Sequence, residues 1–295
     1  MQSGKLMYIG CVLLQSFFYA LCNPLTKIAY RSISPLWLLA IRFSVAAALC
    51  TAFWGKKMLH EVRRLSPSVW LGSSLCCAGA FIAGNLALEY ASATNVGFII
   101  SLSFLFTPFF SFVAMQRKIK LGQIALQMVT VLGMFLLCCN GGQFSFGLGE
   151  LLALGNALFL AGLLAFGESA SKRMSIWSVT TLQIYVAAVF CGLFALAFGG
   201  NVSQLYAVTW DTWLILLYQI LCCTLAAYYL QNVAVKHLSA VTVSAVQCTQ
   251  PIITAGLSWL MLDEPLSTTG LIGAGIIMGC LLLDSVLSKK HGKLI

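Results

Sequence analysis

The stretches Asn85–Val96, NLALEYASATNV, and Asn232–Val243, NVAVKHLSAVTV, decide the fold, because they are two copies of one pattern. At a shift of 147 residues (232 minus 85) five positions are identical, namely Asn85, Ala87, Ser92, Ala93 and Val96 with Asn232, Ala234, Ser239, Ala240 and Val243. Small residues coincide by chance in membrane helices, so the paired asparagines carry the most weight. The match indicates an internal duplication.

An earlier segment is duplicated at a shift of 141 residues (176 minus 35). Ser44–Cys50, SVAAALC, falls on Tyr185–Cys191, YVAAVFC. The two shifts differ by six residues (147 minus 141), which one difference in loop length explains. We therefore predict a first repeat over residues 1–140, a second over 148–288 and a cytoplasmic tail over 289–295.

The composition places the chain in a bilayer, since 60% of its residues are hydrophobic and 8% are charged. A helix needs about 20 apolar residues to cross, so the chain has room for about ten crossings and no separate soluble domain. The predicted fold class is an all-α integral membrane protein of ten transmembrane helices, near residues 6–30, 35–54, 69–89, 93–115, 121–139, 150–170, 178–199, 212–235, 239–262 and 267–287.

Basic residues are concentrated in every other connection. Lys56, Lys57, Arg63 and Arg64 fall in one connection, whereas Asn140–Gly149 contains none. Under the positive-inside rule this alternation predicts a multi-pass protein of the cell membrane with both termini in the cytoplasm. The net charge of +9 is dispersed over short loops, which favours the lipid bilayer and not nucleic acid as the partner.

Five crossings in each copy have a consequence for symmetry. Because five is odd, the second copy enters the membrane from the opposite side, so we predict inverted repeats. Secondary transporters use this arrangement recurrently, since exchanging the conformations of the two copies turns a cavity open to one side into a cavity open to the other. A channel is more often symmetric about the membrane normal.

Short motifs extend through both copies: Ser34–Pro35 followed by Arg42, the segment Tyr229–Ala240, Gln250–Pro251, Leu262–Ser267 and Gly279. With these motifs the chain resembles the drug/metabolite transporter superfamily, specifically the EamA-type permeases, over essentially its whole length. The resemblance implies a ten-helix carrier whose central cavity is lined by spans one to four and six to nine. Family members move amino acids, other metabolites or drugs, and the resemblance favours export.

The first copy departs from the family pattern. Phe104 stands where Pro251 predicts a proline, Pro108 follows one turn later, and Arg117 stands where the second copy has Glu264. Whether the span over residues 93–115 bends therefore stays open.

Arg42 is the first candidate for a transport role. It lies seven residues after Pro35, roughly 10 Å along the predicted helix. Ionisable groups inside a membrane span are costly, and each is by default a functional candidate. Arg42 either binds a substrate carboxylate through both prongs of its guanidinium or bridges helices.

The other cavity candidates are neutral. Gln247 and Gln250 are three residues apart and share a helix face, and Ser103 is the repeat mate of Gln250. Such side chains can instead join helices by hydrogen bonds, and tyrosines near span ends can anchor at the membrane interface. The predicted set is Asn85, Ser103, Gln183, Tyr185, Tyr229, Asn232, Gln247 and Gln250.

Lys27 and Glu168 are repeat mates (27 plus 141) near opposite membrane faces. In one interpretation Lys27 extends to the interface and Glu168 pairs with Lys172 at i,i+4. In the other, Glu168 takes up and releases a coupling proton, because burial disfavours its charged form.

Three further residues are coupling or gating candidates. Glu89 ends the third predicted span, as a loop charge or at the mouth of the cavity. Pro24 and Pro251 lie within spans and free backbone carbonyls, which is tolerated where these face protein or a wet cavity.

These features predict a secondary-active transporter of a small polar metabolite, zwitterionic or amino-acid-like, because Arg42 and Lys27 are mixed with Glu168 and several amides. An organic-cation or drug efflux carrier is one alternative, and a non-transporting receptor or assembly protein is another. We find no nucleophile–base pair, metal cluster or GxxxxGK[ST] loop, so we predict no enzyme, metal or cofactor. Protons or a counter-substrate then supply the coupling, in a monomer or a homodimer.

Overall fold

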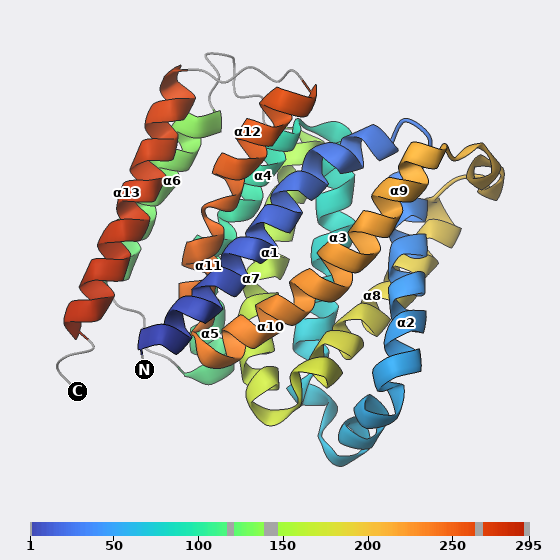
Figure 1. Ribbon diagram of the computed structural model, residues 1–295, viewed down its shortest axis with the longest axis horizontal. Helices are drawn as coiled ribbons and strands as arrows, with labels where there is room; N and C mark the ends of the chain where they lie inside the picture. Colours follow the sequence, from blue (N-terminus) through green and yellow to red (C-terminus); the bar gives the residue numbers. More distant parts are fainter. Residues whose placement is uncertain (1, 117–120, 139–146, 263–267, 292–295) are drawn as a thin grey trace.

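The structure is a computed structural model that describes residues 2–116, 121–138, 147–262 and 268–291. These residues form helices and no strands, arranged as one elongated bundle (Figure 1). In chain order the elements are α1 (Gln2–Ala29), α2 (Pro35–Arg64), η1 (Pro67–Val69), α3 (Leu71–Tyr90), α4 (Ala93–Ser101), α5 (Ser103–Met115), α6 (Leu121–Cys138), α7 (Leu148–Arg173), α8 (Ile176–Phe198), η2 (Val202–Ala207), α9 (Trp210–Tyr218), η3 (Gln219–Ala226), α10 (Ala227–His237), α11 (Ala240–Gln247), α12 (Gln250–Leu262) and α13 (Thr268–His291).

Serines begin the helices at equivalent places in the two copies. Ser92 accepts a hydrogen bond from the Asn95 N–H at the start of α4, and Ser239 accepts one from the Thr242 N–H at the start of α11, both at 3.1 Å. Each serine satisfies a backbone donor that has no partner within its own helix. The duplicated motif, Asn85–Val96 and Asn232–Val243, therefore has the same local structure in both copies.

Seven helices are long and apolar enough to cross a membrane, within the part of the chain that the structure describes. They cover Gly4–Ala29, Pro35–Arg64, Leu71–Tyr90, Asn95–Met115, Leu148–Arg173, Ile176–Phe198 and Trp210–His237. Helices α6 and α13 contain the shorter apolar stretches Ile124–Gly133 and Leu271–Cys280. The predicted number of ten crossings stays a prediction.

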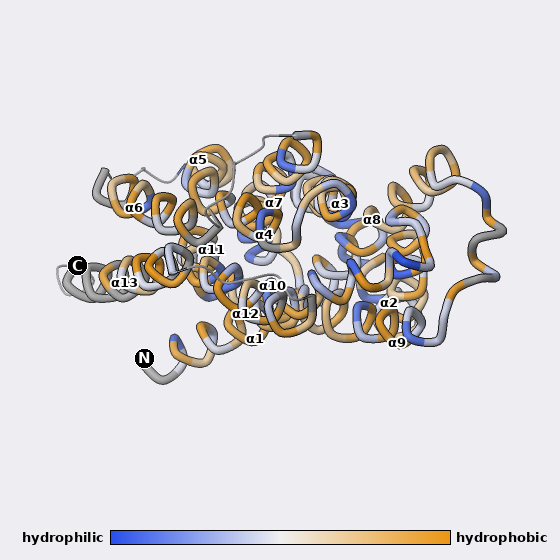
Figure 2. The backbone as a smooth tube through the Cα atoms, turned by 90° about the horizontal axis from the view of Figure 1, so that it is seen from above, coloured by the Kyte–Doolittle hydropathy of each residue, from blue (hydrophilic) through white to orange (hydrophobic). Residues whose placement is uncertain are grey.

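The helix packing keeps its pattern when the two copies are exchanged. Helix α3 packs on α7 as its mate α10 packs on α1, and α5 packs on α7 as α12 packs on α1. The pairs α2 with α8 and α6 with α13 each join a helix to its own repeat mate, and α4 packs on α12 as its mate α11 packs on α5. Figure 2 shows α6 and α13 together at one edge of the bundle and α2, α8 and α9 at the other. The packing is therefore that of two copies related by a twofold rotation.

The predicted helices over residues 93–115 and 239–262 are both interrupted, which answers the question of whether the first of them bends. The breaks fall at Leu102 and at Cys248–Thr249, which are equivalent positions (102 plus 147). In the first copy the Pro108 ring leaves the Phe104 carbonyl without its helical donor. The Gln127 side chain of α6 donates to that carbonyl at 3.0 Å. At the break itself, Leu102 N–H bonds the Ile99 carbonyl and Leu105 N–H bonds the Leu102 carbonyl, and position 104 holds no proline.

Helix boundaries differ from the prediction in two further places. Helix α2 continues to Arg64, beyond the predicted end at residue 54, because the basic residues after Gly55 are good helix formers and Ser66–Pro67 is the first strong stop. Helix α13 runs to His291, so the predicted tail over 289–295 begins inside it. Residues 292–295, Arg117 and Glu264 lie outside the described residues.

The bundle has two ends, which we name by what they hold. The terminal end carries the start of α1, the end of α13 and the connections 173–176 and 237–240 (Figure 1). The vestibule end carries the connections 29–35, 90–93 and 198–210. Since α1 begins and α13 ends at the same end, the chain makes an even number of passes along the bundle.

Gly149 offers a test of the packing between the copies. A Cβ at this position would lie 2.7 Å from the Ala91 Cβ and 3.0 Å from the Ala91 nitrogen, which is backbone and cannot move freely. We predict that Gly149→Ala lowers the stability by about 1–3 kcal/mol in a detergent thermal-unfolding assay. Gly155→Ala, on the same helix with no atom within 4 Å of the added Cβ, is the control and should be neutral or slightly stabilising. Equal melting temperatures for both variants would contradict this packing.

Candidate functional site

A cavity of about 100 Å³ lies inside the bundle, among helices from both copies. Its walls come from α1, α2, α3 and α4 of the first copy and from α7, α10, α11 and α12 of the second. The lining residues are Gln15, Tyr19, Cys22, Asn23, Thr26, Arg42, Ala80, Phe81, Gly84, Asn85, Leu88, Ile100, Asn156, Leu160, Tyr228, Gln231, Gln247 and Gln250.

Arg42 is the charged residue of this wall and is 2% exposed. Its Nε donates to the Thr224 hydroxyl at 2.7 Å, and its guanidinium carbon lies 4.9 Å from the centre of the Phe81 ring. Thr224 in turn donates to the Gln219 carbonyl at 2.9 Å, five residues back, within the π-helical turn η3. The wide π turn therefore holds the acceptor that orients Arg42.

One nitrogen of the guanidinium is available to a ligand. Arg42 Nη2 is buried and has no hydrogen-bond partner among the described residues. Of the described residues that line the cavity, none is acidic. A lone ionised group removed from water costs several kcal/mol unless it is paired, so this site favours an anionic group beside Arg42.

Three carboxamide side chains of the wall form hydrogen bonds with one another. Gln15 Nε2 donates to Gln231 Oε1 at 3.0 Å, and Gln247 Nε2 donates to Gln15 Oε1 at 3.1 Å and to Gln231 Oε1 at 3.3 Å. These bonds tie α1 to α10 and α11. Two side-chain atoms of the wall, Gln247 Oε1 and Asn23 Nδ2, are buried without a partner in the described chain. The wall thus presents both donors and an acceptor.

A second, open cavity of about 690 Å³ lies at the vestibule end, and we name it the vestibule. Lys27, Arg31 and Glu89 line it, and it shares Leu88 with the inner cavity. Between the two spaces the Tyr30 hydroxyl donates to the backbone and side-chain oxygens of Asn85, at 2.9 and 3.0 Å. The vestibule is therefore the approach to the inner cavity from this end.

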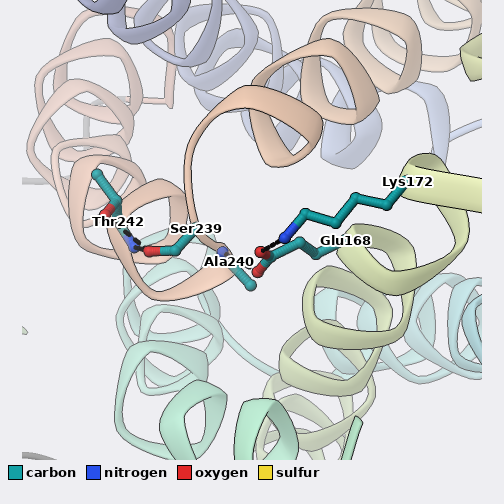
Figure 3. Close-up of polar contacts among 5 residues, drawn as sticks. All are labelled: Glu168, Lys172, Ser239, Ala240 and Thr242. Carbon is teal, nitrogen blue, oxygen red and sulfur yellow. Dashed lines mark hydrogen bonds and ion pairs between the residues drawn. The ribbon is translucent and has the colours of Figure 1, made fainter. Parts of the chain in front are cut away.

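Glu168 is the repeat mate of Lys27, which lines the vestibule. It lies at the terminal end and is fully buried (Figure 3). One carboxylate oxygen bonds Lys172 Nζ at 2.8 Å on the next turn of α7. The other accepts the backbone N–H of Ala240 at 2.8 Å, at the first residue of α11. The carboxylate therefore connects α7 to the start of a helix that reaches the cavity at Gln247.

The comparisons with known proteins agree with this architecture. The EamA-like transporter family matches residues 6–139 and again residues 147–285. The chain belongs to this family. The resemblance to EamA-type members of the drug/metabolite transporter superfamily is thus confirmed, and the long apolar helices agree with a multi-pass membrane protein.

Two similar proteins are informative about the fold of this EamA protein. An uncharacterized transporter of Archaeoglobus fulgidus is 23% identical over 202 residues, and the match spans 62% of this chain and 62% of that protein. A solved structure, titled "Crystal structure of protein", superposes with a TM-score of 0.77 at 18% identity and covers 99% of both chains. At this identity the likeness shows the fold alone.

Four of the nine predicted cavity residues line the inner cavity of the EamA protein: Arg42, Asn85, Gln247 and Gln250. The proline candidates lie beside it, since Pro24 follows Asn23 and Pro251 follows Gln250. Lys27 and Glu89 lie in the vestibule.

Five predicted residues lie outside the lining set. Asn232 donates to Gln183 at 2.8 Å and to Thr180 at 2.9 Å, so the two amides join α10 to α8. Tyr229 stacks on Trp177 with ring centres 4.1 Å apart, and Tyr185 bonds the Thr51 hydroxyl. Ser103 is buried beside the break at Leu102. Helix α8, expected to line the cavity, contributes no described residue to it.

Five of the lining residues that the sequence did not predict are on α1. Gln15, Tyr19 and Asn23 are four residues apart and lie on one helix face, with Cys22 and Thr26 beside them. A polar stripe of this spacing in an otherwise apolar helix was the signal that would have found them. Among the described residues no group of three or more His, Cys, Asp or Glu side chains could hold a metal ion.

Cys22 allows the cavity to be tested in the native chain. We predict that a small sulfonate-bearing thiol reagent, MTSES, modifies Cys22, because its thiol lines the cavity and the reagent's negative charge is attracted to Arg42. Mass spectrometry should show this adduct and its loss in Cys22→Ala, whereas buried Cys191, away from the lining, stays unmodified. Equal modification of both cysteines in the folded protein would contradict the cavity.

Proposed function

We propose that this EamA protein is a secondary-active carrier that moves a small polar organic metabolite by alternating access. In this proposal ten helices cross the cell membrane as two inverted repeats, with both termini in the cytoplasm. The exchange-symmetric packing, the even number of passes and the alternating basic connections support it. The inverted copies would open the cavity to each side in turn.

The unpartnered Nη2 of the Arg42 guanidinium carries the proposal on substrate class. A carboxylate beside Arg42 would pair the buried charge and use the Nη2 group that has no partner in the described chain. The free Gln247 oxygen is an acceptor for an ammonium group, so an amino-acid-like zwitterion fits the wall. We propose export as the direction, on the family resemblance.

The cavity fits an organic cation less well. Tyr19, Tyr228 and Phe81 offer aromatic faces that attract cations. However, Arg42 would repel a cation in a region of low dielectric, and none of the described lining residues is acidic. A carboxylate-bearing substrate is therefore the proposal that we test.

We further propose that protons or a counter-substrate drive transport, with Glu168 as the coupling carboxylate. Its position supports the proposal, since one buried carboxylate bonds both Lys172 of α7 and the first backbone N–H of α11. The other basic or titratable side chains near this end of the packed α10 are Lys236 and His237, and His237 stacks on Tyr8. Protonation of Glu168 would remove the charge that both partners bind.

Arg42→Gln tests the substrate class. We predict that amino acids raise the melting temperature of the purified wild-type protein and that their carboxamide analogues do not. In Arg42→Gln the affinity for the carboxylate should fall by about ten- to a hundred-fold, the expected loss for a hydrogen-bonded charge. Arg42→Lys should lose less, and Arg173→Gln, an exposed basic residue at the terminal end, is the control. Unchanged binding in Arg42→Gln would contradict the assignment.

Glu168→Gln tests the coupling. The amide cannot carry or release the proton, so substrate flux into proteoliposomes should no longer respond to an imposed pH gradient. Counter-substrate exchange should persist if the variant still changes conformation. A variant that kept full proton-dependent flux would rule out Glu168 as the coupling group.

A further inference from the structure

We propose that the Glu168 carboxylate is a latch that holds the terminal end closed, and that the vestibule end differs because its equivalent residue, Lys27, cannot accept the same backbone N–H. This inference rests on the proposed function for the meaning of the two states. It concerns which side of the carrier is open at rest.

The contacts of Glu168 are those of a latch between two moving parts. Helix α7 contributes Asn156 and Leu160 to the cavity wall, and α11 contributes Gln247, two turns after Ala240. The carboxylate binds the first N–H of α11 while the Ser239 hydroxyl binds the Thr242 N–H (Figure 3). Together the Glu168 and Ser239 side chains satisfy N-terminal N–H donors of α11, and Glu168 does so from a different helix, α7.

The other copy has the same elements except for the carboxylate. Ala93 is the mate of Ala240 (93 plus 147), and Ser92 caps α4 as Ser239 caps α11. The residue equivalent to Glu168 is Lys27, whose ammonium only donates and therefore cannot accept the Ala93 N–H. At this end the chain forms the open vestibule, which Lys27 lines.

The energy of one such contact is enough to set a resting state. A hydrogen bond from a backbone N–H to a buried carboxylate is charge-assisted. Its loss shifts a two-state equilibrium by about ten- to a hundred-fold. Removing the latch should therefore favour the state that is open at the terminal end.

The test measures from which side Cys22 is reached, using MTSES on oriented proteoliposomes, and it needs no transport substrate. In the wild type, Cys22 should react with reagent applied at the vestibule side. In Glu168→Ala the ratio of terminal-side to vestibule-side labelling should rise by about ten-fold or more. Glu150→Gln is the matched control, because Glu150 is a buried carboxylate on the same helix that caps the other end, at Gly147.

Two further variants keep the inference falsifiable. Glu168→Gln retains an acceptor for Ala240 and loses the charge, so its labelling ratio should fall between wild type and Glu168→Ala. Lys27→Glu would install the missing acceptor opposite Ala93, so it should lower vestibule-side labelling. Ratios that stay at the wild-type value in folded Glu168→Gln and Lys27→Glu would overturn the latch. A clear shift without any metabolite flux would instead overturn the proposed carrier function and leave the latch standing.

Discussion

Inside a bilayer every backbone N–H and C=O must find a partner within the protein, and the rest of this structure depends on that constraint. It makes the described chain helical and allows breaks only where side chains replace the missing bonds. Gln127 serves the carbonyl that Pro108 leaves open, and Thr224 bonds across the π turn η3. Thr224 also orients Arg42 and the second break precedes Gln250, so irregular backbone supports the cavity wall.

Two buried charges then have different roles, one in the cavity and one at the terminal end. Arg42 lies between the copies with a nitrogen that no described residue binds, so the cavity favours an anion from outside. Glu168 has partners within the chain and ties α7 to α11. Lys27 in the first copy is equivalent to Glu168 in the second copy. The two copies therefore carry opposite charges at equivalent positions, although their architecture is twofold. We propose that this asymmetry decides which side is open at rest.

The sequence predicted the helical class and the family, because composition and duplicated motifs depend on the local chain alone. It also placed Arg42 in the wall, since its depth in the helix follows from Pro35. It misplaced Tyr185 and Tyr229 because the face that a helix turns to its neighbours depends on packing, and Trp177 and Thr51 bind these rings. Whether the span over residues 93–115 bends stayed open, because the partner of the carbonyl that Pro108 frees is Gln127, in a different helix.

The central claim is that the two copies exchange conformations around one cavity. Pulsed electron resonance between spin labels tests it most directly, with one pair at Arg31 and Tyr90 at the vestibule end and a second pair at Arg173 and His237 at the terminal end. When the carboxylate that binds best is added, the two distances should change in opposite directions. Distances that both stay fixed, or that both grow, while the ligand binds would contradict alternating access.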